Sequence, residues 1–173
     1  IKAGVHIGTK IKTRDMKKFI AKIRGDGLAI IDITKTDERL RVVAKFLSRY
    51  EPSEILVVGR RETARKPLQM LNRYTNILTY PKRYPPGLLT NVSLPSFSDV
   101  EVVVITDPIL DKNALLDAYR TGKVIIGLVD TNNTLRYIDI AVPCNNRGAK
   151  SLALIYYLIA REYLRNRGII PKK

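Results

Sequence analysis

The segment Glu54-Ile-Leu-Val-Val-Gly59 decides the fold class of this 173-residue chain. Its four central residues are all apolar, so the strand that they predict has no face suited to water. Continuous runs rich in β-branched residues are typical of strands buried on both faces in a parallel sheet. The segment therefore predicts an α/β protein in which helices cover both faces of such a sheet.

Predicted strands and helices alternate on both sides of this segment. The first helix, residues 36–50, carries Leu40, Val43, Ala44 and Leu47 on one face at helical spacing. Alternation of strands and helices implies right-handed crossovers between parallel strands. The predicted strands are residues 28–33, 54–59, 77–79, 101–106, 124–129 and 138–142, and the predicted helices are residues 36–50, 62–75, 112–121 and 149–167.

Three local features add detail to this pattern. Thr34, followed three residues later by Asp37, predicts a capping box at the start of the first helix. Pro67 is a difficulty for the first turns of the helix at 62–75, because proline has no N–H to donate. Residues 80–95 contain four prolines and are predicted to form a loop.

The N-terminal residues 1–27 do not fit the alternation and are predicted to form a basic hairpin or extended arm. Residues 5–7 and 19–23 alternate like the two strands of a hairpin, and the sequence predicts that they are too polar for the core. Residues 28–173 are predicted to form a single α/β domain, which is long enough to bury a full core.

Charge is the main compositional signal, with a formal net charge of +15 and an isoelectric point near 10.1. Segments 1–24, 60–90 and 144–173 together carry 22 basic and 3 acidic residues, whereas the rest carries 9 and 13. A strongly basic chain with segregated charge is typical of binding to nucleic acids or anionic membranes. A Lys- and Arg-rich surface of the thermophile kind is the alternative, although such surfaces normally carry matching Glu.

Several features bear on location. The longest apolar run, residues 152–160, is too short to cross a bilayer, and no signal peptide is recognisable, so no membrane partner is expected. Cys144 is the only cysteine and has no partner for an internal disulfide, which favours a reducing, cytoplasmic compartment. The chain begins at Ile1 rather than Met, so we expect its natural terminus further upstream.

The basic arm is the strongest candidate for contacts with RNA. Its Lys and Arg side chains would neutralise phosphates and release counterions. Gly4 and Gly8 are expected to let its backbone approach RNA closely. In the proline-rich loop, Tyr84 is a candidate for stacking on an unpaired base while Arg83 holds a phosphate. The alternative is a rigid proline turn whose tyrosines cover the edge of the sheet.

The C-terminal segment offers a second set of polar residues. Asn145-Asn-Arg-Gly148 precedes the last helix, where free N–H groups favour a phosphate. The alternative is that Asn146 simply caps this helix, and the two interpretations can hold together. The apolar stripe of the last helix is assigned to the core or to a protein contact. Arg161, Arg165 and Arg167 are expected to project outward.

An enzyme is the main alternative function. In a parallel sheet, ligands gather at the carboxyl ends of the strands, where Asp32, Asp107 and Asp130 are predicted. Three carboxylates at one edge would suit Mg²⁺-dependent phosphoryl transfer. The competing interpretation is that Asp107, Asp111 and Asp130 cap helices or close turns. No phosphate-binding glycine motif is present, and one histidine, His6, with one cysteine gives no metal-site spacing.

Several motifs together resemble a known family. They are Ala3-Gly-Val-His-Ile-Gly8, Pro85-Pro-Gly-Leu-Leu-Thr-Asn91, Thr106-Asp-Pro108, Asp130-Thr-Asn-Asn133, Val142-Pro-Cys-Asn-Asn-Arg-Gly148, Lys150-Ser-Leu-Ala-Leu154 and Ala160-Arg-Glu162. In this order they are similar to the universal second protein of the small ribosomal subunit, in its archaeal/eukaryotic branch, whose animal members are also called laminin-receptor precursors. The resemblance covers nearly the whole chain, and its specificity comes from the combination of motifs.

The resemblance implies a three-layer fold with a five-stranded, mostly parallel sheet of flavodoxin-like order, 2-1-3-4-5, flanked by helices. It also implies a structural constituent of the small ribosomal subunit that acts in assembly and translation and has no enzyme activity and no cofactor. The expected partners are small-subunit ribosomal RNA and neighbouring ribosomal proteins, with no small-molecule substrate. The long acidic tail of animal members is absent, which favours an archaeal chain and argues against laminin binding, although residues 142–168 match the region associated with it.

The candidate RNA-binding residues are the basic and polar side chains of the arm and of the matching motifs. They are Lys2, His6, Lys10, Lys12, Arg14, Lys17, Lys18, Arg24, Arg60, Arg61, Lys82, Arg83, Tyr84, Asn145, Asn146, Arg147, Lys150, Arg165 and Arg167. No catalytic and no metal-binding residue is predicted. A protein-interaction or cell-surface role through the last helix stays open as a third hypothesis.

Overall fold

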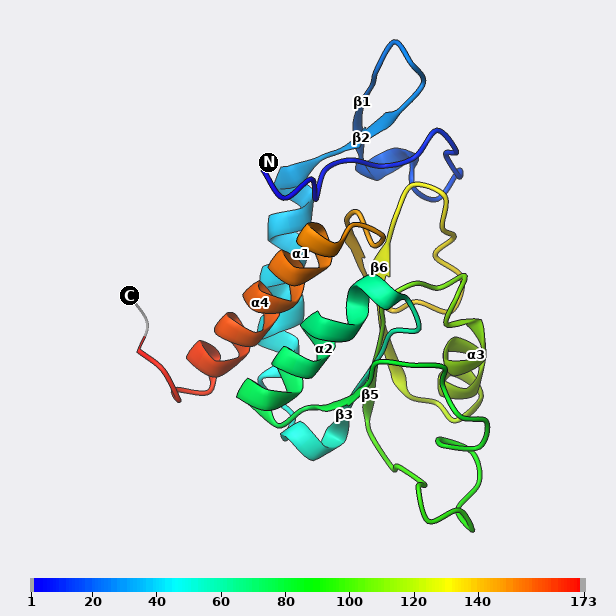
Figure 1. Ribbon diagram of the computed structural model, residues 1–173, viewed down its shortest axis with the longest axis vertical. Helices are drawn as coiled ribbons and strands as arrows, with labels where there is room; N and C mark the ends of the chain where they lie inside the picture. Colours follow the sequence, from blue (N-terminus) through cyan, green and yellow to red (C-terminus); the bar gives the residue numbers. More distant parts are fainter. Residues whose placement is uncertain (1, 172–173) are drawn as a thin grey trace.

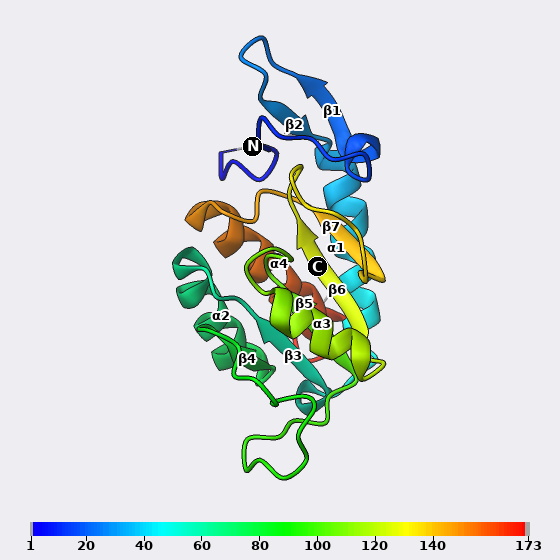
Figure 2. The same ribbon diagram turned by 90° about the vertical axis from the view of Figure 1, so that its right-hand side faces the viewer.

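The computed structural model describes residues 2–171, so Lys172 and Lys173, two of the cations counted above, lie outside the described residues. Its centre is a five-stranded parallel sheet, seen edge-on in Figure 1, in the order β4-β3-β5-β6-β7, whose strands Figure 2 labels. Counted within this sheet, the order is 2-1-3-4-5, which confirms the expected α/β fold. The strands are β3 (Ile55–Val58), β4 (Leu78–Tyr80), β5 (Val102–Ile105), β6 (Val124–Val129) and β7 (Ile140–Pro143).

The apolar runs of the central strands bury both faces of the sheet, as their composition predicts. In β3, Ile55 and Val57 face the larger part of the core, whereas Leu56 and Val58 face the other side. Three helices, α1, α2 and α4, cover the first face, and α3 with the proline-rich loop covers the second (Figure 2). The result is the three-layer arrangement that the sequence predicts. The helices are α1 (Ile33–Leu47), α2 (Glu62–Thr75), α3 (Lys112–Arg120) and α4 (Ala149–Asn166).

Helix α1 begins three residues earlier than predicted. The carboxylate of Asp32 accepts a hydrogen bond from the backbone N–H of Thr34 at 2.9 Å, so Asp32 is the N-cap. The predicted capping box at Thr34 and Asp37 is therefore wrong, and Asp37 instead pairs with Arg41 one turn later. Helix α2 has its predicted bounds and continues through Pro67.

The predicted strand at 28–33 is not part of the parallel sheet. Its residues form β2 (Ala29–Ile31), which pairs antiparallel with β1 (Ile20–Ile23) in a separate two-stranded sheet. The turn that joins the two strands passes through Gly27, whose φ of +84° suits glycine. Residues 5–7 are therefore not the partner of β1, and only Ile7 adds an isolated bridge to Ile30. The domain division at residues 27 and 28 stays a prediction.

Several residues of the arm belong to the core, so the prediction that the arm is too polar for it is wrong. Met16 and Phe19 are buried and pack with Val129 and Ala141 of the sheet. Val5 joins the larger cluster of buried residues. The arm therefore lies against the domain through its few apolar side chains, and its numerous cations remain outside. No helix within residues 2–171 has the length and apolar character needed to cross a membrane.

Candidate nucleic-acid interface

The N-terminal arm lies across the carboxyl edge of the sheet, above the ends of β6 and β7 (Figure 1). The backbone N–H of Thr9 donates to Oγ1 of Thr131 at 2.8 Å, immediately after β6. The N–H of Asn145, just after β7, donates to the carbonyl of Val5 at 2.8 Å. Further along, the hydroxyl of Thr13 donates to the carbonyl of Asn133 at 2.6 Å. These bonds between residues far apart in sequence give the arm a defined position.

Gly8 is the point of closest approach between the arm and the sheet edge. A Cβ at this position would lie 2.6 Å from Cγ2 of Thr131 and 2.9 Å from the carbonyl oxygen of Ala29. The expectation that Gly8 serves a close approach to RNA is therefore wrong, because its buried backbone packs against the protein itself. Gly4 has φ +71° and accepts a hydrogen bond from the side-chain amide of Asn145, so it also serves the docking of the arm.

The exposed cations of the arm surround this docked backbone, and strand ends bring further cations to the same edge. Parallel strands all end at one edge, so Arg60 after β3, Arg83 after β4 and Arg147 after β7 share it with the arm. Arg60 and Arg83 line one small pocket, and Lys10 and Arg147 line another. We call these exposed residues the basic edge: Lys2, Lys10, Arg14, Lys17, Lys18, Lys22, Arg24, Arg60, Lys82, Arg83, Arg147 and Lys150.

Three buried carboxylates lie beneath the basic edge and hold its loops. Asp130, completely buried, accepts from the backbone N–H of Thr131 and from the guanidinium of Arg147, the latter at 3.3 Å. Asp107 pairs with the guanidinium of Arg61. The carboxylate of Asp111 accepts hydrogen bonds from the backbone N–H groups of Asp107 and Arg60. Burial raises the pKa of Asp130, and raises that of Asp111 to about 6.

These contacts account for the carboxylates as turn and cap residues, so the magnesium-dependent enzyme is not supported. Asp32 caps α1 instead of ending a strand of the parallel sheet. Asp107 and Asp130 are each neutralised by an arginine of the same edge. Within residues 2–171, no group of three His, Cys, Asp or Glu side chains is arranged to hold a metal ion. Asp111 likewise closes the loop before α3, as the alternative interpretation predicts.

Tyr84 does not present a ring to RNA, which corrects the stacking hypothesis. Its side chain is only 3% exposed and packs in the core between the sheet and α3. Its hydroxyl donates to the carboxylate of Asp117 at 3.0 Å and accepts from the N–H of Leu89 at 3.2 Å. The proline-rich loop is thus a cover for the sheet, as the alternative predicts, while Lys82 and Arg83 remain exposed.

The polar residues before α4 are occupied within the protein. Oδ1 of Asn145 accepts the N–H groups of Arg147 and Gly148 at 3.0 and 3.1 Å, so these groups are not free for a phosphate. Asn146 is buried and donates to Leu128 and Asn133 rather than capping the helix. The expected cap by Asn146 is therefore wrong, and Asn145 organises the turn instead.

Two more of the predicted RNA-binding residues, Lys12 and Arg61, lie outside the basic edge because they have partners in the protein. Nζ of Lys12 donates to the carbonyl of Gly27 at 3.1 Å, which ties the arm to the hairpin turn. Arg61 is largely covered through its pair with Asp107. His6 is half-buried, and its Nδ1 has no hydrogen-bond partner among the described residues.

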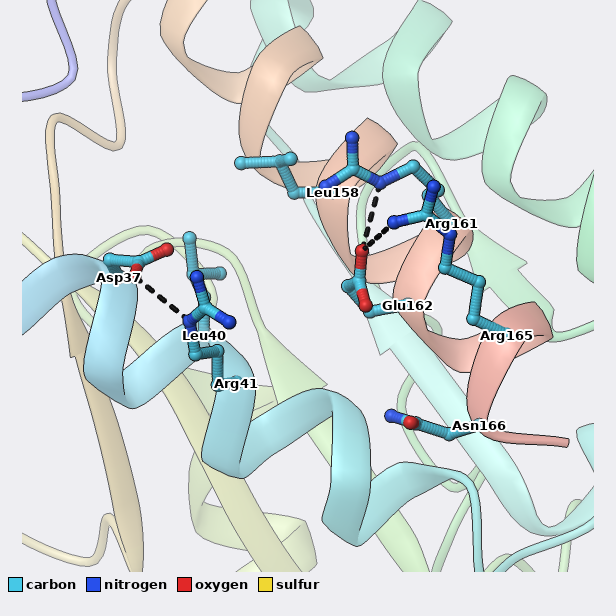
Figure 3. A pocket seen from close by; sticks show the side chains of 8 residues that line it. All are labelled: Asp37, Leu40, Arg41, Leu158, Arg161, Glu162, Arg165 and Asn166. Carbon is cyan, nitrogen blue, oxygen red and sulfur yellow. Dashed lines mark hydrogen bonds and ion pairs between the residues drawn. The ribbon is translucent and has the colours of Figure 1, made fainter. Parts of the chain in front are cut away.

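Arg165 and Arg167 lie at the other end of α4, about 24–27 Å along the helix from Ala149. Arg165 and Arg161 both donate to the carboxylate of Glu162 at 2.9 Å (Figure 3). Arg167 donates to both oxygens of Glu51 at 2.8 Å, and its pKa is raised chiefly by this pairing. The last helix therefore does not present all of its cations on the basic edge, and these arginines do not simply project outward.

An aromatic cluster escaped the sequence analysis. Tyr119 at the end of α3 and Tyr137 in the β6–β7 connection pack with their ring centroids 4.2 Å apart and their planes tilted by 37°, and the guanidinium of Arg136 lies 4.7 Å from the Tyr137 ring. Tyr119 is more than half exposed. Leu135 donates to Asp15 of the arm, so the cluster adjoins it. The dipeptide Arg136-Tyr137 was the available signal, but nothing in the sequence places Tyr119 beside it.

Comparison with known proteins identifies the family. The family model for ribosomal protein S2 matches residues 1–98 and 95–165. The chain is 60% identical over 172 residues to the small ribosomal subunit protein uS2 of Nanoarchaeum equitans, covering 99% of this chain and 86% of that protein. The proteins of the same name from Methanococcus maripaludis strain C5 and Staphylothermus marinus are 49% and 48% identical, over 99% and 98% of this chain and 78% and 77% of their own lengths. The chain therefore belongs to the ribosomal protein S2 family, in its archaeal form, and not to a family of enzymes.

Proposed function

We propose that this chain, a structural constituent of the small ribosomal subunit, binds small-subunit ribosomal RNA through the basic edge. The observation that carries the proposal is the docked arm: its backbone is fixed to the sheet edge, while its cations stay exposed. A positioned row of cations binds phosphates with a smaller loss of chain entropy than a mobile tail.

The distribution of acidic residues supports the same surface. The three carboxylates in the loops after β5 and β6, Asp107, Asp111 and Asp130, are buried and committed to neighbouring groups. They therefore hold the loops while contributing little negative charge at the surface. The net charge of +15 leaves the chain attractive to a polyanion at long range.

Base contacts are assigned to the cluster of Tyr119, Tyr137 and Arg136. A base that stacks on the exposed face of Tyr119 would extend the existing aromatic cluster, and base–aromatic stacking contributes about 1–3 kcal/mol. Phosphates of the same strand would then meet the exposed cations of the arm. In this arrangement the arm contributes affinity for RNA through phosphate contacts, and the aromatic cluster contributes a preference for an unpaired base.

Charge reversal tests the proposal. Lys10, Arg14 and Lys17 are exposed arm residues, and changing all three to Glu leaves the docking bonds of the arm in place. We expect the triple variant to fold with an unchanged circular-dichroism melt but to bind small-subunit RNA with a log–log salt slope reduced by about 2–3. Its incorporation into small subunits depleted of this protein should fall in parallel.

The matched control reverses three exposed cations away from the edge: Lys45 in the last turn of α1, Arg49 just after the end of that helix, and Arg73 in the last turn of α2. This variant has the same net charge as the first. If both variants lose the same amount of incorporation, total charge decides binding and the basic edge has no special part.

Neighbouring small-subunit proteins are the second proposed class of partner, and the cytoplasmic ribosome is the proposed location. The far end of α4, where Arg161 and Arg165 converge on Glu162, is accessible for such a contact (Figure 3). Fractionation should then find the chain with cytoplasmic small subunits and not free.

A further inference from the structure

An apolar groove runs between α2 and α4 on the face of the molecule where the three helices pack. It encloses about 530 Å³. It is lined by the small side chain of Ala153 on α4, by Pro67 on α2, and by the larger side chains of Met70, Tyr74 and Tyr157. Small lining side chains among larger ones leave room for side chains of another molecule.

The larger side chains that line the groove are exposed to a degree unusual for their type. Tyr74 is 64% exposed, Tyr157 is 58% exposed and Met70 is 39% exposed. Tyrosine and methionine are enriched where proteins meet, because they bring large contact areas at a modest entropic cost. Three of them around one groove form a contiguous apolar patch instead of isolated surface residues.

Pro67 gives the groove a polar feature as well. Proline has no N–H, so the carbonyl of Thr63 four residues earlier lacks its usual donor within the helix. Thr63 and Pro67 both line the groove. A donor of a partner that reached this carbonyl would not have to displace a hydrogen bond of the helix.

The charges around the groove decide the kind of partner. Lys66 lines it from α2 and Lys150 from α4, and in the described part of the chain no Asp or Glu lines it. We propose that this groove binds an acidic segment of a neighbouring protein, whose bulky apolar side chains fill the groove while its carboxylates meet the two lysines. The inference rests on the proposed ribosomal function, which provides neighbouring proteins.

Two other occupants fit less well. A second copy of the chain would bring another net charge of +15 and another pair of lysines, which repel. RNA would place a chain of phosphates over a lining that is mainly hydrocarbon and aromatic and that carries two lysines, Lys66 and Lys150.

Site-specific photo-crosslinking in assembled small subunits tests the proposal. The full chain would carry p-benzoylphenylalanine in place of Tyr157, and crosslinked products would be identified by mass spectrometry. We expect one dominant adduct, with a peptide of another subunit protein in which Asp and Glu outnumber Lys and Arg. The control carries the same crosslinker in place of Val42, which is exposed on α1, on the other side of α4, and should give at least tenfold less of that adduct.

A pair of groove variants then tests the charge argument. Ala153 is exposed, so Ala153→Glu and Ala153→Lys both fit the helix and add side chains of similar length. Repulsion from an acidic partner should lower the yield of the adduct about tenfold more in Ala153→Glu than in Ala153→Lys. Equal yields of the adduct from Ala153→Glu and Ala153→Lys would overturn the proposal that the partner is acidic.

The other outcomes separate this inference from the proposed function. An adduct with RNA, with a basic peptide or with a second copy overturns the groove proposal, as does the absence of any adduct in subunits that contain the chain. Failure of the chain to enter subunits at all contradicts the proposed function instead.

Discussion

Replacement of Gly8 by alanine tests how the arm is held. A Cβ at this position would lie 2.6 Å from Cγ2 of Thr131 and 2.9 Å from the carbonyl oxygen of Ala29. The second contact is with backbone, so rotation of one side chain cannot relieve it. Overpacking of this kind costs about 1–3 kcal/mol, and the arm must move to avoid it. The N–H of Gly8 donates to that same carbonyl at 2.9 Å, so the movement also weakens the bond.

Urea unfolding and hydrogen exchange measure the effect. The free energy of unfolding should fall by about 1–3 kcal/mol, or the arm should undock while the domain stays folded. In either case the amide of Thr9, which donates to Thr131, should exchange about ten- to a hundredfold faster. Binding to small-subunit RNA should weaken, because the cations of the arm are no longer positioned.

Two further variants control this experiment. Gly25→Ala places its Cβ in open space in the hairpin turn, and stability should stay within about 0.5 kcal/mol of the wild type. Adding Thr131→Ser to Gly8→Ala removes the nearer methyl group but keeps Oγ1, so part of the lost stability should return. Equal behaviour of Gly8→Ala and Gly25→Ala would refute the reasoning, since the docked arm would then not depend on the close approach.

Three more predictions concern the interior. Tyr84→Phe should lower the free energy of unfolding by about 1–2 kcal/mol in urea titrations, because the hydroxyl bonds Asp117 and Leu89; weaker RNA binding at unchanged stability would show instead that the ring reaches RNA. Burial raises the pKa of Asp111 from 3.8 to about 6, so between these two pH values the native state binds more protons than the unfolded state. The stability that the protonated Asp111 carboxyl contributes is therefore lost as the pH rises through 6. The free energy of unfolding of Asp111→Asn, measured relative to that of the wild type, should therefore rise by about 1–3 kcal/mol between pH 4.5 and pH 7. The same difference between variant and wild type at both pH values would contradict this. Burial also raises the pKa of Cys144, so iodoacetamide should label this thiol only after denaturation, and rapid labelling of the folded chain would count against its burial.

The parallel sheet could be predicted from sequence because its strands carry their own signal. Residues 55–58 and 102–105 are apolar on both faces, and only a central strand satisfies such a run. The bounds of α2 were also predicted, and Pro67 did not interrupt the helix. The three basic segments were equally visible, because charge is a property of composition.

The placement of residues 28–31 was not predictable in the same way. Ala29, Ile30 and Ile31 are as apolar as a strand of the main sheet, but they pair with residues 20–23 across a glycine turn. A short apolar run does not specify its partner strand, since the backbone hydrogen bonds of either pairing are similar. The choice depends on the backbone hydrogen bonds that Ala29 makes with Gly8 and Thr9, which only the folded chain brings near.

Sequence by itself determined the fold class, the family motifs and the surplus of cations, because each is written in local composition or periodicity. Tertiary structure alone decided which cations serve one surface. It brought Arg60, Arg83 and Arg147 to the edge where the arm is docked, and it left Arg165 and Arg167 paired with glutamates at the far end of α4. It also buried Tyr84 and exposed Tyr119, although the two are chemically identical. The physical reason is that burial and pairing depend on neighbours that are distant along the chain, and those neighbours are set only when the sheet closes against its helices.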